Sequence, residues 1–236
     1  MDDLYKYPRV YVDAPLAAGA DLTLDADHAH HLRVVLRRGD GDRIRLFNGR
    51  NGEFLAALVC AGKRDVVARI ETGLRSFVPR TRRLRLFFAP LKKDRMDALI
   101  DCAVQLDATD LHPVLTERTE VRELKSDKLA AHIRDAAQQC ERMDLPVLHA
   151  LAPLDRALAG LDCPLFAGVE RCDLKPLRDM LVPAGDAAAL VGPVGGWTQG
   201  ERAMLLERPG IVPVTLGPNV LRAETAVAAM LTRLAS

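Results

Sequence analysis

The chain has 236 residues, of which 49% are hydrophobic and 28% charged, and its formal net charge is +1. This length allows one large domain or two small ones with a substantial core, and the composition is that of a globular protein. No apolar run is long enough to cross a membrane, the N-terminus is not a signal peptide, and the five cysteines include no C-x-x-C pair. These features exclude a membrane or secreted protein and predict a cytoplasmic one with reduced thiols.

The small net charge hides a division along the chain. Residues 1–95 hold 19 lysines and arginines against 12 acidic residues, whereas residues 96–236 hold 14 against 20. The basic half is therefore a candidate surface for a polyanion, and its densest stretch is 75–95. A solvated surface without a partner is the alternative interpretation of the same charges.

Residues 1–75 have the pattern of short strands with one helix. An asparagine- and glycine-rich turn at 48–52 predicts a hairpin, and Asp25 or Asp27 can cap the helix. The pattern therefore predicts a small β-barrel. The expected strands cover 8–12, 42–47, 52–59 and 66–71, and the expected helix covers 27–38.

The polar stretch 76–83, which includes Pro79, is the best domain boundary and predicts domains at 1–76 and 77–236. After this boundary, strands alternate with helices, the pattern of an α/β domain with a parallel sheet covered on both faces. The expected strands cover 84–89, 111–115, 164–169, 187–191 and 211–216. The expected helices cover 94–106 (capped by Asp94), 128–142, 174–181, a segment starting at the capping box of Thr198 and Glu201, and 221–234.

Two glycine-marked segments near the end of the chain carry the strongest functional signal. The first is L-V-G-P-V-G-G-W-T-Q-G-E at 190–201, and the second is V-T-L-G-P-N-V-L-R-A-E-T-A at 214–226. Each has the pattern of a buried strand, a turn and a helix start, so the two turns can lie together at the carboxyl ends of neighbouring parallel strands, where α/β sheets bind ligands. Neither is a P-loop or a G-x-G-x-x-G motif, which favours a neutral adenosine-type ligand held by backbone groups over a phosphate. Purely structural turns are the alternative.

These segments resemble the cofactor-binding signature of the RsmE family, SPOUT-class methyltransferases with a trefoil knot that methylate N3 of a uridine in 16S ribosomal RNA. The match is unbroken over 216–226, whereas Val194 stands where the family usually has Glu. The stretches 92–97 and 136–146 are also similar to family segments, although Gln138 replaces a usual Glu. The resemblance implies a PUA-like RNA-binding barrel followed by a knotted methyltransferase domain.

The resemblance further implies that S-adenosylmethionine is the cofactor and that the strand end at 166–170 forms a third wall of its site. The residues expected to bind the cofactor are Val191, Gly192, Pro193, Gly195, Gly196, Leu216, Gly217, Val220 and Leu221.

Methylation of uridine requires N3 to lose its proton and to face the methyl group in line, with water excluded. Arg222 is expected to stabilise the anion that develops on the uracil carbonyls. Glu224 is a candidate general base. Its alternatives are to orient Arg222 or to stabilise the start of the last helix as a first-turn carboxylate.

The cations expected to contact RNA lie in both predicted domains. A metal site is not expected, because the histidines at 28, 30 and 31 lack a completing cysteine or carboxylate pattern. The expected RNA-binding residues are Arg33, Arg37, Arg38, Lys92, Arg95 and Arg142.

The expected partner is 16S ribosomal RNA within the 30S subunit, and the resemblance implies a homodimer. Two other readings stay open: a SPOUT methyltransferase for another RNA, and a non-catalytic RNA-binding module whose pocket has decayed at Val194 and Gln138. A third, an α/β enzyme for a different nucleotide, is disfavoured because a phosphate-binding loop is missing.

Overall fold

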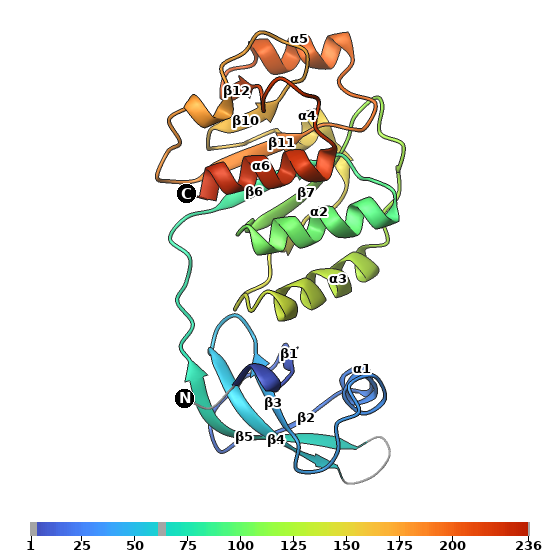
Figure 1. Ribbon diagram of the computed structural model, residues 1–236, viewed down its shortest axis with the longest axis vertical. Helices are drawn as coiled ribbons and strands as arrows, with labels where there is room; N and C mark the ends of the chain where they lie inside the picture. Colours follow the sequence, from blue (N-terminus) through green and yellow to red (C-terminus); the bar gives the residue numbers. More distant parts are fainter. Residues whose placement is uncertain (1–3, 61–64, 236) are drawn as a thin grey trace. The chain divides into compact units, whose positions relative to one another are not determined.

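The computed structural model describes residues 4–60 and 65–235 (Figure 1). The predicted domains also include residues that lie outside the described ones, namely 1–3, 61–64 and 236. The described chain forms two compact units. One runs to residue 79 and also includes residues 137–144, and the other contains residues 80–136 and the chain from residue 145 onward.

The first unit is built on a five-stranded sheet in the order β1-β3-β4-β5-β2. Its strands are β1 (Arg9–Tyr11), β2 (Asp21–Thr23), β3 (Arg43–Phe47), β4 (Glu53–Cys60) and β5 (Val66–Arg75). The β1–β3 pair is parallel and the other pairs are antiparallel. Apolar residues of all five strands, together with Leu32, form one core, because the strands alternate in polarity. β2 is absent from the predicted strands, since D-L-T is too short to show a period.

The predicted helix of the first unit forms in two parts. Helix α1 (Ala26–His30) begins at Asp25, whose Oδ1 accepts a hydrogen bond from the His28 amide at 2.8 Å. It continues as a π-helical turn over His31–Val35. The helical stretch then ends at Leu36, since Arg37 has a left-handed φ of 54°.

The second unit is a parallel sheet in the order β12-β10-β11-β6-β7-β8, with β9 paired to β7. Its strands are β6 (Leu84–Phe88), β7 (Asp110–Leu115), β8 (Val147–Leu148), β9 (Ala152–Pro153), β10 (Leu165–Gly168), β11 (Ala187–Val191) and β12 (Ile211–Val214). β6 and β11 are buried along their whole length, as expected for a sheet with both faces covered.

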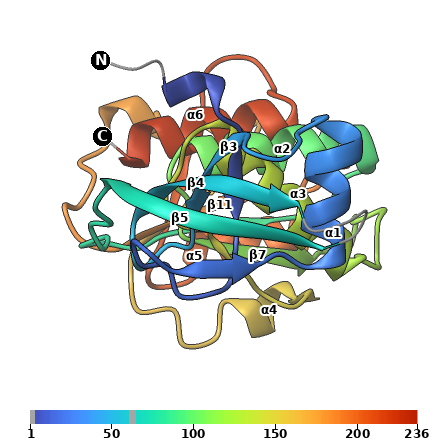
Figure 2. The same cartoon turned by 90° about the horizontal axis from the view of Figure 1, so that it is seen from below.

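Helices cover both faces of this sheet. Helices α2 (Lys93–Gln105) and α6 (Ala223–Ala235) pack together on one face, while α4 (Leu154–Ala157) and α5 (Gln199–Glu207) lie on the other (Figures 1 and 2). Helix α3 (Ser126–Gln139) precedes the residues that rejoin the first unit. The short turns Leu4–Lys6 and Leu177–Asp179 are 3₁₀ helices. None of the described helices is long and apolar enough to span a membrane.

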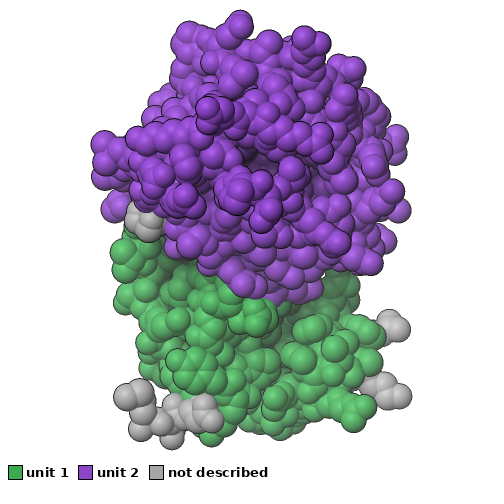
Figure 3. Space-filling model, turned by 45° about the horizontal axis from the view of Figure 1, so that its top comes forward, with its two compact units in different colours: residues 1–79, 137–144 green, residues 80–136, 145–236 purple. Residues whose placement is uncertain are grey.

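Residues 137–144 belong to the first unit because a buried carboxylate and three arginines hold them there (Figure 3). Glu53 pairs with Arg9 at 2.6 Å and with Arg75 at 2.5 Å, and its Oε1 lies 3.7 Å from Nη1 of Arg45. The Arg9 guanidinium also donates to the carbonyls of Ala137 and Arg142, at 2.9 and 3.1 Å. A buried charge needs such partners, so the segment is tied to the sheet by hydrogen bonds that Glu53 orients.

Three sequence expectations about helices are wrong in detail. Lys92, not Asp94, occupies the N-cap of α2, and it makes no side-chain cap. Helix α3 ends at Gln139 rather than at residue 142, because Glu141 has a left-handed φ of 60°, which a helix cannot continue through. The helix expected over 174–181 is only the 3₁₀ turn, because the Leu177 amide bonds to the Thr215 carbonyl at 3.0 Å and so draws this segment against the end of β12.

Candidate active site

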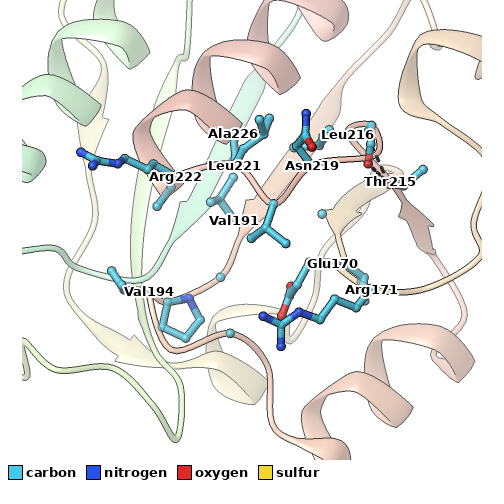
Figure 4. A pocket seen from close by; sticks show the side chains of 18 of the residues that line it. Glu170, Arg171, Val191, Val194, Thr215, Leu216, Asn219, Leu221, Arg222 and Ala226 are labelled. Carbon is cyan, nitrogen blue, oxygen red and sulfur yellow. Dashed lines mark hydrogen bonds between the residues drawn. The ribbon is translucent and has the colours of Figure 1, made fainter.

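A pocket of about 610 Å³ lies at the carboxyl ends of β11, β10 and β12 in the second unit (Figure 4). The two glycine turns form two of its walls. They do not follow neighbouring strands, because β10 lies between β11 and β12. The end of β10 forms the wall between the two turns, and of the third wall expected over 166–170, residues 168–170 line the pocket.

The first turn depends on glycine at two positions. At Gly192, an added Cβ would lie 2.7 Å from the ring of Trp197, which is buried and donates from Nε1 to the Gly168 carbonyl at 2.9 Å. Trp197 thus packs over its own turn and links it to the end of β10. At Gly196, φ is 71° and a Cβ would lie 2.5 Å from Oε1 of Glu170. Only glycine lets the backbone approach these two side chains.

Neighbouring segments hold the first turn in place. The Arg118 guanidinium donates to the Gly195 carbonyl at 3.0 Å. The predicted capping box forms at the start of α5, where Thr198 and Glu201 satisfy each other's backbone amides. Glu201 also accepts a hydrogen bond from the Glu117 amide at 2.8 Å. The turn is therefore shaped before any ligand enters, which reduces the entropy lost on binding.

The second turn follows β12 and is shaped by Thr215. Its hydroxyl donates to the Gly217 carbonyl at 3.1 Å and accepts from the Gly217 amide at 3.3 Å. Gly217 has a φ of 132°, a conformation that other residues rarely adopt. The turn then runs through the exposed Val220 to Arg222, next to the first residue of α6.

All nine residues expected to bind the cofactor line this pocket. Pro218 and Asn219 line it too, and they lie within the stretch 216–221 that the resemblance places around the cofactor. Sequence reasoning missed Thr215 and Arg171, which also line the pocket. Thr215 directly precedes the matched stretch and could have been found there. Arg171 enters through a left-handed φ of 58°, which no sequence pattern signals.

The charged side chains of the pocket stand on opposite sides. Glu170 and Arg171 lie together on one side, and Arg222 lies on the other side, which it shares with Val194 (Figure 4). Arg222 is exposed and donates no hydrogen bond to any residue in 4–60 or 65–235. Val194 is also exposed, with 56% of its surface accessible. Val194 therefore gives this side of the pocket an exposed apolar rim.

Arg95 lines the pocket instead of lying on an open phosphate-binding face. Its Nη2 bonds to Oε2 of Glu224 at 2.7 Å, and its Nε lies 3.1 and 3.2 Å from the two carboxylate oxygens. The hydrogen bonds from Arg95 hold the pKa of the Glu224 carboxyl below its usual value, assisted by the charge of Arg222. Glu224 itself does not line the pocket, so it is placed to orient Arg95.

The other expected RNA contacts lie in different surroundings. Arg37 is exposed and Arg33 and Arg38 are half-buried at the end of the first unit's helical stretch, while Lys92 is exposed and pairs with Glu120 at 2.9 Å. Arg142 requires a correction. It is 7% exposed, and its Nε donates to Asp144 at 2.9 Å, so it shapes the 137–144 segment and is not placed on the surface for RNA.

Among the described residues, Asp110, His112 and His149 bring three possible metal ligands within 4.8 Å of one another. Sequence reasoning did not single out this group. The imidazole rings stack in parallel with centroids 3.8 Å apart, and Arg83 lies 3.9 Å from the Asp110 carboxylate. Parallel rings do not direct both nitrogens at one ion and a neighbouring cation repels it, so the group is not arranged as a metal site.

Two family models match the chain. One, described as an RNA methyltransferase domain, matches residues 79–235, and the other, an RNA methyltransferase PUA domain, matches residues 24–71. The α/β fold of SPOUT type with a PUA-like domain is thereby confirmed. The trefoil knot is a matter of chain threading that strand order does not specify, and it stays a prediction.

Relatives of known name cover nearly the whole chain. The ribosomal RNA small subunit methyltransferase E of Rickettsia conorii is 33% identical over 94% of this chain and 92% of its own length. The structure of the Neisseria gonorrhoeae enzyme of that name, bound to S-adenosyl methionine, superposes with a TM-score of 0.84 at 30% identity over 95% of both chains. A putative methyltransferase of Legionella pneumophila with the same bound cofactor has a TM-score of 0.84 at 30% identity, over 97% of this chain and 96% of its own.

Two independent features support the family that the sequence predicts. The glycine turns come together into one pocket at the end of the sheet. The full-length similarity to proteins that carry this name covers both units of the chain. This chain belongs to the ribosomal RNA small subunit methyltransferase E family.

Proposed function

We propose that the pocket binds S-adenosylmethionine and that the protein transfers its methyl group to N3 of a uridine in 16S ribosomal RNA. The observation that carries this proposal is the joining of both signature turns in one pocket of about 610 Å³, a volume within the range of small-molecule sites. The cofactor bound to the Neisseria and Legionella proteins supports it, since both share the fold over almost the full chain.

The residues of the pocket fit this cofactor. The glycine positions carry no side chain, so an adenine and a ribose can approach the backbone of both turns closely enough for hydrogen bonds. Glu170 is the acidic side chain among the lining residues, and it can accept hydrogen bonds from ribose hydroxyls or attract a cationic group. When bound, S-adenosylmethionine supplies an electrophilic methyl group on a sulfonium.

The chain's own residues act on the other reactant. Uridine N3 becomes nucleophilic when its proton leaves, and the negative charge then spreads to the two carbonyl oxygens. Arg222 lies at the pocket without a hydrogen-bond partner among the described residues, so its guanidinium is free to bind one of those oxygens. The apolar rim formed by Val194 and Val220 helps to exclude water from the reacting atoms.

We assign the RNA-binding role to the domain at 1–76 and catalysis to the domain at 77–236. Arg33, Arg37 and Arg38 end the helical stretch beside the exposed Val34 and Val35, and such cations set affinity for phosphates. Lys92 extends the role to the second domain. We further propose that the protein acts on the 30S subunit in the cytoplasm as a homodimer, with the exposed Val194 and Val220 in the interface.

Calorimetric titration of the purified protein with S-adenosylhomocysteine tests the cofactor assignment, and we expect one site per chain. Methyl transfer to 30S subunits that lack the modification, followed by mapping of the methylated base, tests the substrate. Binding with methylation of tRNA or 23S RNA instead would make the protein a methyltransferase for another RNA. Absence of binding to folded protein would leave an RNA-binding module with a decayed pocket.

A further inference from the structure

The ion pair of Arg95 and Glu224 lies at the edge of the pocket, and the contacts between the two helices that carry it do not depend on it. Arg95 comes from the first turn of α2 and Glu224 from the first turn of α6. The two helices already pack through buried apolar side chains such as Leu99, Ile100 and Val227. The pair lies at the pocket end of this packing, where the Arg95 side chain is 31% exposed and that of Glu224 is 18% exposed.

The hydrogen bonds of the pair leave one part of the guanidinium open. Nε and Nη2 of Arg95 are bound to the carboxylate, and Nη1 has no hydrogen-bond partner among residues 4–60 and 65–235. The guanidinium group is planar, so when a carboxylate binds its Nε and one Nη, the remaining N–H groups point in a fixed direction. Because Arg95 lines the pocket, its guanidinium is within reach of a ligand there.

Glu224 does not have the properties of a general base. Both of its oxygens lie within 3.2 Å of Arg95 nitrogens, and these hydrogen bonds hold its carboxyl pKa below the usual range. A base for uridine N3 needs a pKa closer to the operating pH, so this carboxylate is poorly matched to the proton. The group is suited to fixing Arg95.

We propose that Arg95 is a second catalytic cation, which binds the uracil carbonyl oxygen that Arg222 does not reach, and that Glu224 is its positioning residue. This inference rests on the proposed function. The N3 proton leaves to solvent water, the anion is held between the two guanidinium groups, the N3–methyl bond forms as the sulfur–methyl bond breaks, and sulfur keeps the electron pair as a neutral thioether. A second cation, held in place by Glu224, stabilises the anion more than Arg222 does alone, and so raises the fraction of deprotonated uridine at neutral pH.

The charged neighbours of Arg95 are few. Glu224 faces it from α6, and the charge of Glu120 acts on it from the segment after β7; both favour its charged form. Glu224 is faced by Arg95, by Arg222 and by the neutral thiol of Cys102, whose pKa is raised by burial. The hydrogen bonds to Glu224 raise the pKa of Arg95, which therefore stays charged near neutral pH, so a change in the pH–rate profile caused by its removal reports the substrate N3.

The test compares Arg95→Met, Glu224→Gln and the double variant with wild type on 30S subunits across pH 6 to 10. We expect Arg95→Met to lower kcat at pH 7 about 100-fold, the loss typical of one anion-stabilising donor, and to shift the rate profile to higher pH. Glu224→Gln should shift it in the same direction by less. The double variant should match Arg95→Met, because Glu224 acts only through Arg95.

Lys93→Met is the matched control, since it removes a cation that is 84% exposed in its side chain from the same helix turn, and it should keep wild-type kinetics. Titration with S-adenosylhomocysteine checks that each variant is folded. An unchanged pH–rate profile of Arg95→Met overturns the inference. A double variant that is much slower than Arg95→Met also overturns it, because Glu224 would then act as the base. Wild type that binds no cofactor or methylates no uridine overturns the proposed function and the inference with it.

Discussion

Arg222 lines the pocket, and within 4–60 and 65–235 its guanidinium donates no hydrogen bond, so its proposed chemical role is separate from any role in folding. The neighbouring cation Arg95 is fixed by a carboxylate, whereas Arg222 is held only by its backbone, through the bond from the Ala226 amide to its carbonyl. Exposed side chains that donate no hydrogen bond contribute little to stability. Substitutions here are therefore expected to affect turnover alone.

Arg222→Ala should lower kcat for methyl transfer about 100-fold or more, while cofactor affinity and thermal stability stay at wild-type values. The reason is that the variant removes charge that stabilises the substrate anion and leaves the backbone bond intact. Single-turnover methylation of 30S subunits measures the effect. Arg178→Ala, at a 75% exposed side chain outside the pocket, is the control. Unimpaired turnover by Arg222→Ala would remove Arg222 from the mechanism.

Gly192→Ala should weaken cofactor binding at least 10-fold and lower the free energy of unfolding by about 1–3 kcal/mol, because the new methyl group meets the Trp197 ring at 2.7 Å. Calorimetry and urea unfolding measure the two effects. Gly200→Ala in α5 is a matched control with open space around it, and it should stabilise the protein slightly, since alanine favours a helix. Equal behaviour of the two variants would contradict the packing described for the turn.

At the scale of the elements, β6, β7 and the segment after β8 share a stack of aromatic rings. Phe87 stacks on His112 at 4.4 Å, and His112 stacks on His149 at 3.8 Å. Burial lowers the pKa of His112 to about 4, assisted by the nearby charges of His149, Arg85 and Arg83 and opposed by Asp110. The folded chain therefore holds His112 neutral at pH values where the unfolded chain protonates it.

Stability should consequently rise with pH between about 4 and 6.5. In this window the unfolded state binds more protons than the folded state, so raising the pH favours folding, by at most about 3 kcal/mol. Above the pKa of the unfolded chain the contribution of His112 to stability is complete, and as the pH falls towards 4 it is lost.

His112→Phe, which keeps a ring on Phe87, should flatten this part of the stability curve when urea unfolding is measured at several pH values. His31→Gln, at an exposed position, should not. A variant as pH-dependent as wild type would show that another group is responsible.

The sequence predicted the long, strongly patterned elements well. β11 has the predicted bounds and the capping box at Thr198 forms, because a fully apolar run and a local hydrogen-bond pattern are both written in neighbouring residues. The elements it missed depend on distant partners. β8 and β9 are two residues long and form only against β7, and the 174–181 helix yields to pairing with the segment after β12.

The same distinction applies to the site. Every residue expected to bind the cofactor lines the pocket, since these residues are contiguous in two turns. The pairing of Arg95 with Glu224 joins residues 129 positions apart, and nothing local signals it. Arg142 was misjudged for the same reason, because its burial depends on the fold of the first unit.

At the scale of the whole molecule, the first unit is discontinuous. Its sheet is formed within residues 9–75, and residues 137–144 are bound to it through the carbonyls that accept from Arg9 and the carboxylate of Glu141, which pairs with Arg45 at 2.9 Å. The domain boundary expected at residue 76 therefore marks a change in amino-acid composition. The compact unit that begins the chain also includes residues 137–144.

A fragment of residues 1–76 should unfold more easily than the same residues in the full chain. Arg9 and Arg45 would lose charged hydrogen bonds worth about 1.5–3 kcal/mol each, while Glu53 stays buried between them. Chemical unfolding monitored by circular dichroism measures the loss. A control fragment, 1–79 joined by a flexible linker to 137–144, should recover most of it. Equal stability of the two fragments would mean that the segment is dispensable.

Trp197 is the only tryptophan of the chain, and it lies against Gly192 at the wall of the pocket. Its indole is buried and hydrogen-bonded to the end of β10, so its emission depends on the contacts of the one place where the cofactor is expected. The protein thus contains a built-in optical reporter. Selective excitation of this single fluorophore can follow ligand entry in a stopped-flow instrument, without a label, a second tryptophan to subtract or an engineered variant.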